Sequence, residues 1–238
     1  MKRTGRLFAF VMSVSLAWFG LSGCLKSNPS VDTTARTYLN VMHMAPSTVP
    51  VQIYLNDQSS SNSFPVLSYS TLYSPLTVGT YNIKFKKSGG DSLVAAVPAL
   101  DYDTSRFYTI FTYQDLDNTV KAIRIQDIFN NPATDKIHFR FWHFGPDAPN
   151  VDVYIGTDKV MTNRNYIDNT STAELNAFQD FAPGNYKIYI KETGTDNVLA
   201  ESDAVDLLPG NYYTFFLKGL TAETGDKKLS LGLLRAAQ

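Results

Sequence analysis

The sequence predicts an all-β fold in which two tandem immunoglobulin-like antiparallel β-sandwiches follow a signal peptide and a flexible tether. Three observations predict it. Short segments rich in β-branched and aromatic residues alternate apolar with polar side chains. Turn signals built on Gly and Pro separate these segments. The second half of the chain also repeats the pattern of the first half.

The segments 151–155 (Val-Asp-Val-Tyr-Ile) and 81–86 (Tyr-Asn-Ile-Lys-Phe-Lys) show the alternation most clearly. In each, every second residue is apolar, as expected of a half-buried strand. Turn signals separate such runs at Gly79, 88–90, 183–184 and 209–210. No segment shows a helical period. About seven short strands in roughly 100 residues are typical of an immunoglobulin-like sandwich.

The internal repeat runs at two offsets. Residues 41–54 correspond to 141–154 at an offset of 100, with His, Pro, Val and Tyr in the same register. Further on, 79–83 corresponds to 184–188, and 107–111 to 212–216, at an offset of 105. An insertion in the second copy, between Tyr154 and Gly184, accounts for the difference. The chain is therefore predicted to contain a duplicated module.

The N-terminus has the plan of an export signal. Basic residues precede the uncharged run 7–21, which falls short of the roughly 20 apolar residues that a spanning helix needs. The run ends in Leu21-Ser22-Gly23-Cys24, which resembles the lipobox of bacterial lipoproteins. We therefore expect cleavage between Gly23 and Cys24. Cys24 is then expected to carry a lipid, with acyl chains such as palmitate, as its membrane anchor.

The predicted organisation has four parts. They are a lipoprotein signal peptide (1–23), the lipidated cysteine with a flexible tether (24–36), a first β-sandwich (37–132) and a second β-sandwich (135–238). The tether is polar and lacks apolar periodicity. Because Leu25 rather than an aspartate follows Cys24, we expect the outer membrane of a Gram-negative bacterium, by resemblance to enterobacterial lipoproteins.

Composition excludes some classes of partner. The chain has one cysteine, so no disulfide can form within it. Removing the three basic residues of the signal leaves 18 basic against 22 acidic residues, a net charge of −4. Nucleic-acid binding is therefore not expected, because it normally needs a basic excess gathered on one face.

A family resemblance is carried by residues 143–154, His-Phe-Gly-Pro-Asp-Ala-Pro-Asn-Val-Asp-Val-Tyr. This segment resembles the H-x-S-P-D-A-P-x-V-D-V-Y signature of the bacterial family called domain of unknown function 4397. Segments 183–186 and 209–214 resemble its later P-G-x-Y and G-x-x-Y-T elements. The first copy departs from the signature, because 47–50 replaces the D-A-P run and Gln52 replaces the aspartate. The resemblance implies an envelope-attached β-sandwich with no assigned activity.

Catalytic motifs such as G-x-S-x-G, H-E-x-x-H, C-x-x-C and the P-loop are absent from the sequence. His143, Asp147 and Asp152 could still form a metal or acid–base site, as in a hydrolase or metal-dependent enzyme. The structural alternative has Asp147 bonding to turn backbone and Asp152 on the exposed face of a strand. The first copy keeps His43 but lacks both aspartates. We therefore expect no enzyme activity, no metal and no cofactor.

Two surface features allow a binding role. Alternation places Trp142 on the opposite face of its strand from Phe141 and His143. There it could stack on a sugar, or it could pack against the other module. Lys84, Lys86 and Lys87 could bind anionic glycans. We expect instead that they lie on a solvated strand face or protect a strand edge from pairing. The predicted partners are thus the membrane, through lipid on Cys24, and a protein or glycan of unknown identity.

The two repeated histidines are predicted to be structural. Alternation places His143 on the side of Phe139 and Phe141, and His43 on the side of Leu39. A histidine there can be buried as a neutral ring that bonds to turn backbone groups.

Overall fold

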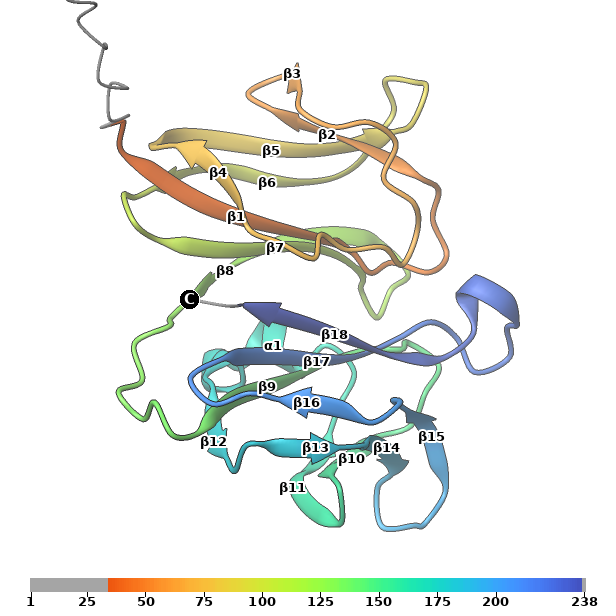
Figure 1. The fold of residues 1–238 in the computed structure, drawn as a ribbon. Helices are drawn as coiled ribbons and strands as arrows, with labels where there is room; N and C mark the ends of the chain where they lie inside the picture. The colour runs from red at the N-terminus through yellow and green to blue at the C-terminus, as the bar shows by residue number, and fades with distance from the viewer. Residues whose placement is uncertain (1–33, 237–238) are drawn as a thin grey trace, which may run out of the picture. The chain divides into compact units, whose positions relative to one another are not determined.

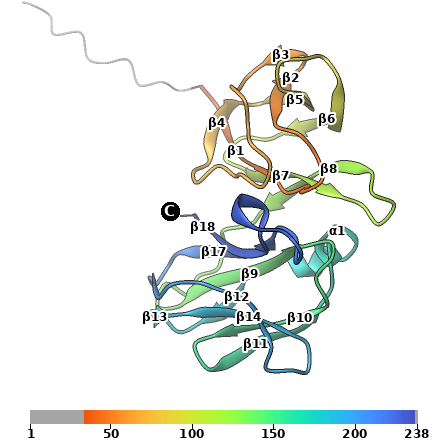
Figure 2. The ribbon, with the colours of Figure 1, turned by 90° about the vertical axis from the view of Figure 1, so that its right-hand side faces the viewer.

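The computed structural model describes residues 34–236, which belong to one compact unit. The predicted signal peptide, Cys24 and most of the tether lie outside the described residues. The regular secondary structure of the described residues is almost all β-strand, as Figures 1 and 2 show. Between residues 34 and 236, no helix has the length and apolar character that crossing a membrane requires. The predicted all-β sandwich fold is confirmed.

The first repeat contains two four-stranded sheets. Sheet A has the strand order β4-β1-β7-β8, and sheet B has the order β3-β2-β5-β6. The strands are β1 (Arg36–His43), β2 (Val51–Leu55), β3 (Gln58–Ser59), β4 (Ser74–Thr77), β5 (Gly79–Lys87), β6 (Leu93–Tyr102), β7 (Phe107–Gln114) and β8 (Val120–Asp127).

The second repeat has the same plan. Sheet C has the order β12-β9-β17-β18 and sheet D the order β11-β10-β14-β15, with β13 and β16 paired beside it. The strands are β9 (Ile137–Phe144), β10 (Val151–Ile155), β11 (Asp158–Arg164), β12 (Gln179–Phe181), β13 (Gly184–Tyr186), β14 (Ile188–Glu192), β15 (Val198–Glu201), β16 (Val205–Leu207), β17 (Tyr212–Lys218) and β18 (Ser230–Ala236). Three short helical turns interrupt it: α1 (Asp168–Ser171), η1 (Ala173–Asn176) and η2 (Gly225–Lys227).

One strand pair in each repeat is parallel rather than antiparallel. In sheet A, β1 runs parallel to β7, with Leu39 opposite Tyr108. In sheet C, β9 runs parallel to β17, with Phe139 opposite Tyr213. The remaining paired strands among residues 34–236 are antiparallel. Alternation of side chains has the same period in both pairings, so it predicts a strand without predicting the direction of its neighbour.

The repeated tyrosines have equivalent partners in the two copies. Near the start of β5, Tyr81 pairs with Leu100, and Tyr186 of β13 pairs with Val205. Gly184 precedes Tyr186 with a φ of 157°, and a Cβ placed there would lie 2.8 Å from the tyrosine ring. The Gly-x-Tyr motif therefore provides a site where an aromatic ring covers bare backbone.

The second pair of tyrosines fixes a sandwich corner. The Tyr213 hydroxyl accepts a hydrogen bond from the backbone N–H of Leu208 at 2.7 Å. In the first repeat, Tyr108 accepts from the backbone N–H of Asp103 at 3.4 Å. A tyrosine that bonds to backbone a few residues upstream is the tyrosine corner of immunoglobulin-like sandwiches.

Three apolar cores lie between four layers of sheet, in the order B, A, C, D (Figure 1). Sheets A and B enclose the first core, and sheets C and D enclose the second. The third core joins the outer faces of sheets A and C, so it lies between the repeats. Its buried members are Met42, Met44, Phe111, Tyr113, Ile125, Trp142, Phe144, Ile167, Phe216 and Leu234.

Strand β9 shows why the repeats pack this way. All eight of its residues are buried. Phe139 and Phe141 contribute to the core within the second repeat, whereas Trp142 and Phe144 contribute to the core between the repeats. A strand that is apolar on both faces needs a cover on both. The first repeat supplies the second cover through Phe111, whose ring centroid is 4.9 Å from that of Phe144.

Candidate functional site

His143 is buried at the end of β9 and both of its ring nitrogens are bonded. The backbone N–H of Gly145 donates to Nδ1 at 3.2 Å, which leaves Nε2 as the protonated nitrogen. Nε2–H then donates to the carbonyl oxygen of Pro149 at 3.1 Å. Burial lowers the pKa of His143 below its ordinary value, although the hydrogen bond to Pro149 opposes the shift.

His43 occupies the equivalent place in the first repeat. It is fully buried, and its Nε2 lies 3.0 Å from the carbonyl oxygen of Val49. A carbonyl only accepts, so Nε2 carries the proton, and Nδ1 accepts from the hydroxyl of Thr112 at 2.6 Å. Burial also lowers the pKa of this histidine. Both rings thus span the turn that follows the first strand of their repeat.

Asp147 does not bond within its own turn, contrary to the expected turn role. Its carboxylate accepts from the backbone N–H of Thr221 at 2.9 and 3.0 Å, and from the Thr221 hydroxyl at 2.6 Å. The interaction links the β9–β10 loop to the loop after β17. The sequence signal for it was weak, because 74 residues separate the partners.

Asp152 is 1% exposed, which corrects the expectation that it lies on an exposed strand face. Its carboxylate accepts from Lys159 Nζ at 2.7 Å and from the backbone N–H of Asn163 at 2.9 Å. The hydroxyls of Thr162 and Thr193 also donate to it, each at 3.0 Å. Burial would raise the pKa of this carboxyl, but these donors outweigh burial and hold the pKa well below its usual range. Asp152 therefore connects β10 to β11 and to the β14–β15 turn.

The three predicted candidates do not form one site. No hydrogen bond among the described residues joins any two of His143, Asp147 and Asp152. Both nitrogens of the histidine and both oxygens of each aspartate are used in structural bonds. Within residues 34–236, no cluster of three or more His, Cys, Asp or Glu is placed to hold a metal ion.

Trp142 is not a sugar-stacking platform in this structure, because it is completely buried. Its ring contacts that of Phe111 across the interface between the repeats, with centroids 5.3 Å apart. Its Nε1–H donates to Asn176 Oδ1 at 2.9 Å. As alternation predicted, the Trp142 side chain points away from the core of its own sandwich. It is buried because the first repeat packs against that face.

The three lysines Lys84, Lys86 and Lys87 lie on β5, which is an inner strand of sheet B and hence not a guarded edge. Lys84 is paired with Asp57 at 2.6 Å, and Lys86 lies 4.5 Å from the ring centroid of Tyr54. The outer face of sheet B is thus a solvated face with local charge pairing, and it provides no concentrated basic patch.

An ion pair that the sequence reasoning missed lies inside the interface between the repeats. Arg140 of β9 and Asp127 of β8 are both completely buried, with Nη2 and Oδ1 2.5 Å apart. Thr109 and Tyr73 donate further hydrogen bonds to Asp127, at 2.7 and 2.8 Å. The only sequence signal is an arginine within the otherwise apolar and aromatic run of β9.

Aromatic rings pack on the Arg140 guanidinium and exclude water from it. The guanidinium carbon is 4.0 Å from the ring centroid of Trp142 and 4.4 Å from that of Phe178. Its Nε–H donates to Thr214 Oγ1 at 2.9 Å. The contact with Arg140 holds the partly buried ring of Phe178 in place near the surface.

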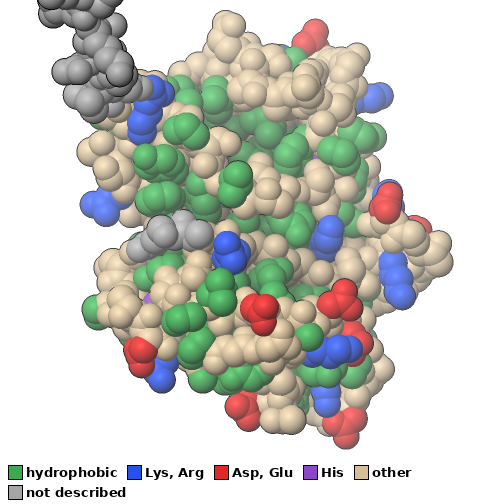
Figure 3. Space-filling model, in the orientation of Figure 1, with side chains coloured by type: hydrophobic (Ala, Val, Ile, Leu, Met, Phe, Trp, Pro, Cys, Tyr) green, Lys and Arg blue, Asp and Glu red, His purple; other side chains and the backbone are tan. Residues whose placement is uncertain are grey.

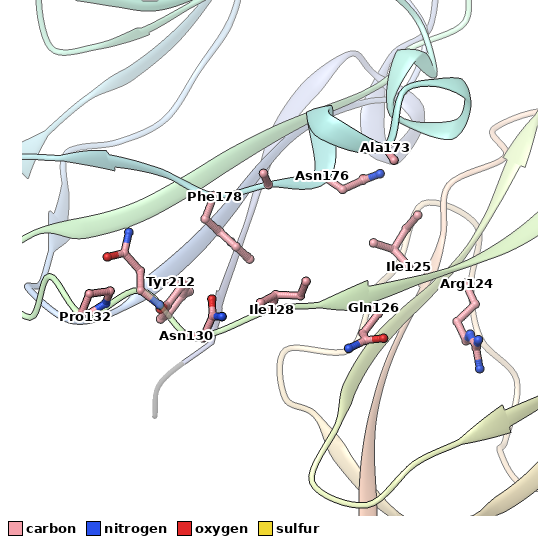
Figure 4. Close-up of a pocket in the computed structure, with 12 residues that line it drawn as sticks. Arg124, Ile125, Gln126, Ile128, Asn130, Pro132, Ala173, Asn176, Phe178 and Tyr212 are labelled. Carbon is pink, nitrogen blue, oxygen red and sulfur yellow. The ribbon is translucent and has the colours of Figure 1, made fainter.

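A groove of about 700 Å³ opens next to Phe178, and we call it the linker groove. One wall is the loop 173–178, and the other is the end of β8 with the linker 128–132. Figure 4 shows Phe178, Ile128 and Ile125 approaching the same space from these two walls. Tyr212 closes one end. The volume is in the range of sites that hold small ligands.

The sequence reasoning did not predict the linker groove. Its walls come from three segments that are far apart along the chain, and none of them carries a chemical motif. One indirect signal existed, since the loop 173–178 lies in the segment between Tyr154 and Gly184, where the second copy is longer than the first. The groove is therefore a property of the way the two repeats pack.

The fold and these sites define a class of protein, a chain of two fused all-β sandwiches. In this structure the candidate residues His143, Asp147 and Asp152 form hydrogen bonds that hold loops and strands together. The chain belongs to the family described as Domain of unknown function (DUF4397), which matches residues 37–154 and 145–235. The two matched segments confirm that the family is present twice. A comparison with curated proteins found no match.

Proposed function

We propose that the protein is a membrane-anchored lipoprotein of the cell envelope, in which the two fused sandwiches act as a non-enzymatic binding or structural module. The observation that carries the anchor is the sequence Leu21-Ser22-Gly23-Cys24, with Cys24 as the sole cysteine. Lipid on this residue both attaches the chain and removes an otherwise reactive thiol.

The non-enzymatic role is supported by how the candidate residues are used. His143 has no free nitrogen, and Asp152 accepts four hydrogen bonds. A general acid or base needs a proton or lone pair directed at a substrate. The hydrolase alternative would require these residues to leave the bonds that hold the loops of the second repeat together.

The surface argues for a partner other than nucleic acid. On the face shown in Figure 3, basic side chains are scattered and interspersed with acidic ones. Several lysines have acidic neighbours, such as Lys159 with Asp152 and Lys187 with Glu201. A protein or glycan partner fits such a surface better than a phosphate backbone does.

The proposed location is the outer membrane of a Gram-negative cell, with the folded part attached to it through Cys24. Leu25 supports this, because it stands where an aspartate would indicate retention in the inner membrane. Recovery of the protein with inner-membrane markers on density-gradient fractionation would reject the location without rejecting the anchor.

The anchor is tested by metabolic labelling with a radioactive or clickable fatty acid. The wild-type chain is expected to incorporate the label and to sediment with membranes. Cys24→Ser removes the acceptor, so the label should be lost and the protein should leave the membrane fraction. Ser22→Ala keeps a small residue before the cut and serves as the matched control, with labelling retained. Labelling of the Cys24→Ser variant would contradict the proposal.

A further inference from the structure

We propose that the linker groove binds a neutral saccharide, an assignment that rests on the binding role proposed above and names its ligand class. The groove has apolar walls, side-chain amides at its rim, a single charged lining residue and a rigid backing.

The walls offer apolar surface of the kind that a sugar ring can cover. Phe178 stands on one wall and Ile128 on the other, and Tyr212 lies at the end (Figure 4). Ile128 is 57% exposed, so much of its side chain is available for contact with a ligand. Aromatic and aliphatic side chains line most small-molecule sites and can contact the C–H faces of a pyranose.

Side-chain amides supply the polar contacts. Asn130 lies on the linker wall and makes no hydrogen bond within the described chain. Asn176 lies on the opposite wall, held through its Oδ1 by the Trp142 indole and through its Nδ2 by the carbonyl oxygen of Asn169. An amide combines donors with an acceptor, so it matches a hydroxyl, which is also both. Asn130 can therefore both donate to and accept from a sugar hydroxyl, whereas Asn176 keeps one N–H to donate, because its Oδ1 accepts from Trp142 and Asn169.

The groove is nearly free of charge, which sets the ligand class. Among the described residues that line it, Arg124 is the only charged one. Its guanidinium is already engaged, because Nη1–H donates to the carbonyl oxygen of Asp101 at 2.5 Å and the group lies 4.7 Å from the ring centroid of Tyr102. Because no acidic side chain is among these lining residues, a cationic ligand would lose hydration without gaining a counter-ion, and an anionic ligand would meet a single guanidinium that is already bonded to Asp101 and packed on Tyr102. A neutral, hydroxyl-rich ligand avoids this cost.

The backing of the groove is rigid, which favours binding with little loss of entropy. Phe178 packs between the Arg140 guanidinium, 4.4 Å away, and the ring of Tyr212, 5.0 Å away. The backbone carbonyl of Asn176 accepts from Arg140 Nη1 at 3.3 Å. The buried ion pair between the repeats thus holds the loop wall in place before a ligand arrives.

A peptide is the competing occupant, and the structure disfavours it. A peptide strand would have to add to the free edge of β8. The side chain of Arg124 is held across to β6 through its bond to Asp101, which places β6 beside this edge. Saccharide binding needs no strand edge.

The test uses the full-length protein in a detergent without a sugar headgroup, because a glycosidic detergent would compete. The protein is first applied to an array of neutral glycans, and the best binders are measured by isothermal titration calorimetry. Three variants follow. Ile128→Lys places a cation in the groove, Asn130→Ala removes one amide, and Leu116→Lys is the matched control at an 84% exposed leucine outside the groove.

The expected result is binding of at least one neutral glycan, weakened about tenfold or more by Ile128→Lys and about fivefold by Asn130→Ala, the usual effect of losing one hydrogen bond. Leu116→Lys should bind like wild type. Absence of binding to every neutral glycan, or binding that both groove variants leave unchanged, would overturn the assignment. Binding of an uncharged peptide that Ile128→Lys weakens would also overturn the assignment.

Failure here is distinguishable from failure of the proposed function. If acyl labelling through Cys24 and membrane attachment persist while no neutral glycan binds, the ligand class is wrong and the anchored module remains. If the label is absent while glycans bind, the anchor is wrong and the groove assignment remains.

Discussion

Arg140 and Asp127 come from different repeats and meet inside the interface between them, with 2.5 Å between Nη2 and Oδ1 and no exposure of either side chain. The first repeat has no equivalent arginine, since Asn40 occupies the corresponding place and its Oδ1 is buried without a hydrogen-bond partner. The ion pair therefore distinguishes the two copies. It favours docking of the second repeat on the first over docking of two identical copies.

The ion pair predicts a strong response to removal of one partner. Arg140→Met should lower the free energy of unfolding by about 3 to 5 kcal/mol, because it leaves the Asp127 carboxylate buried without a counter-ion. The double variant Arg140→Met/Asp127→Asn should lose less than the two single losses added together. Urea unfolding of the four proteins measures this. Additive losses would show that the two side chains do not depend on each other.

Because Trp142 lies in the core between the repeats, we expect the two repeats to unfold together. Trp142→Ala should lower the free energy of unfolding by about 3 to 5 kcal/mol, since it leaves a cavity in the core between the repeats. Hydrogen exchange should accelerate in β5 of the first repeat as well as in β14 of the second, because the three cores share sheets A and C. Val198→Ala, at a 43% exposed position of β15, is the control. Faster exchange confined to the second repeat would contradict a single cooperative unit.

The histidines predict a pH dependence near neutrality. Burial lowers the pKa of both His43 and His143 from the ordinary value of 6.5. The unfolded chain then binds protons at a pH where the folded chain does not. Stability from these residues is therefore complete above about pH 6.5 and declines as the pH falls towards the lower folded pKa.

Two variants test this pH dependence. In His43→Gln/His143→Gln the free energy of unfolding should change less between about pH 7.5 and pH 5.5 than in wild type, because glutamine does not titrate. His143→Ala should cost about 1 to 3 kcal/mol at pH 7.5, since the N–H of Gly145 and the carbonyl of Pro149 lose their partner, while ligand binding persists in the folded protein. A variant as stable as wild type that has lost binding or an activity would favour the enzyme alternative.

We expect Asp152, which lies in the family-signature segment 143–154, to contribute to stability. Asp152→Asn should lower the free energy of unfolding by about 1 to 3 kcal/mol, because the carboxylate accepts from Lys159 and from three groups around it. Asp196→Asn is the matched control, since that side chain is fully exposed. Equal stability of the two variants on urea unfolding would show that the Asp152 bonds contribute nothing net.

Much of the fold could be predicted from the sequence, because alternation and turns are local signals. The strands around 81–86 and 151–155 form where the alternation placed them. The parallel partner of β1 could not be predicted, because its identity depends on a crossover that local periodicity does not encode. The short helical turns in 168–176 are too brief to show a helical period.

The site was harder to predict because it depends on contacts between distant segments. The sequence placed Asp152 on the outward side of its strand, but Lys159, Thr162 and Thr193 cover that side. Trp142 likewise faces away from its own sandwich and is covered by the first repeat. Alternation gives the direction of a side chain relative to its own sheet. What lies in that direction is decided by tertiary packing.

The central functional claim is the lipid anchor, and mass spectrometry of the mature N-terminus tests it most directly. The protein is isolated from membranes of the native host and digested, and its first peptide is sequenced. We predict a chain that starts at Cys24, with a diacylglyceryl thioether on the sulfur and a mass increased accordingly. An unmodified chain that starts at any other residue would contradict the lipoprotein account.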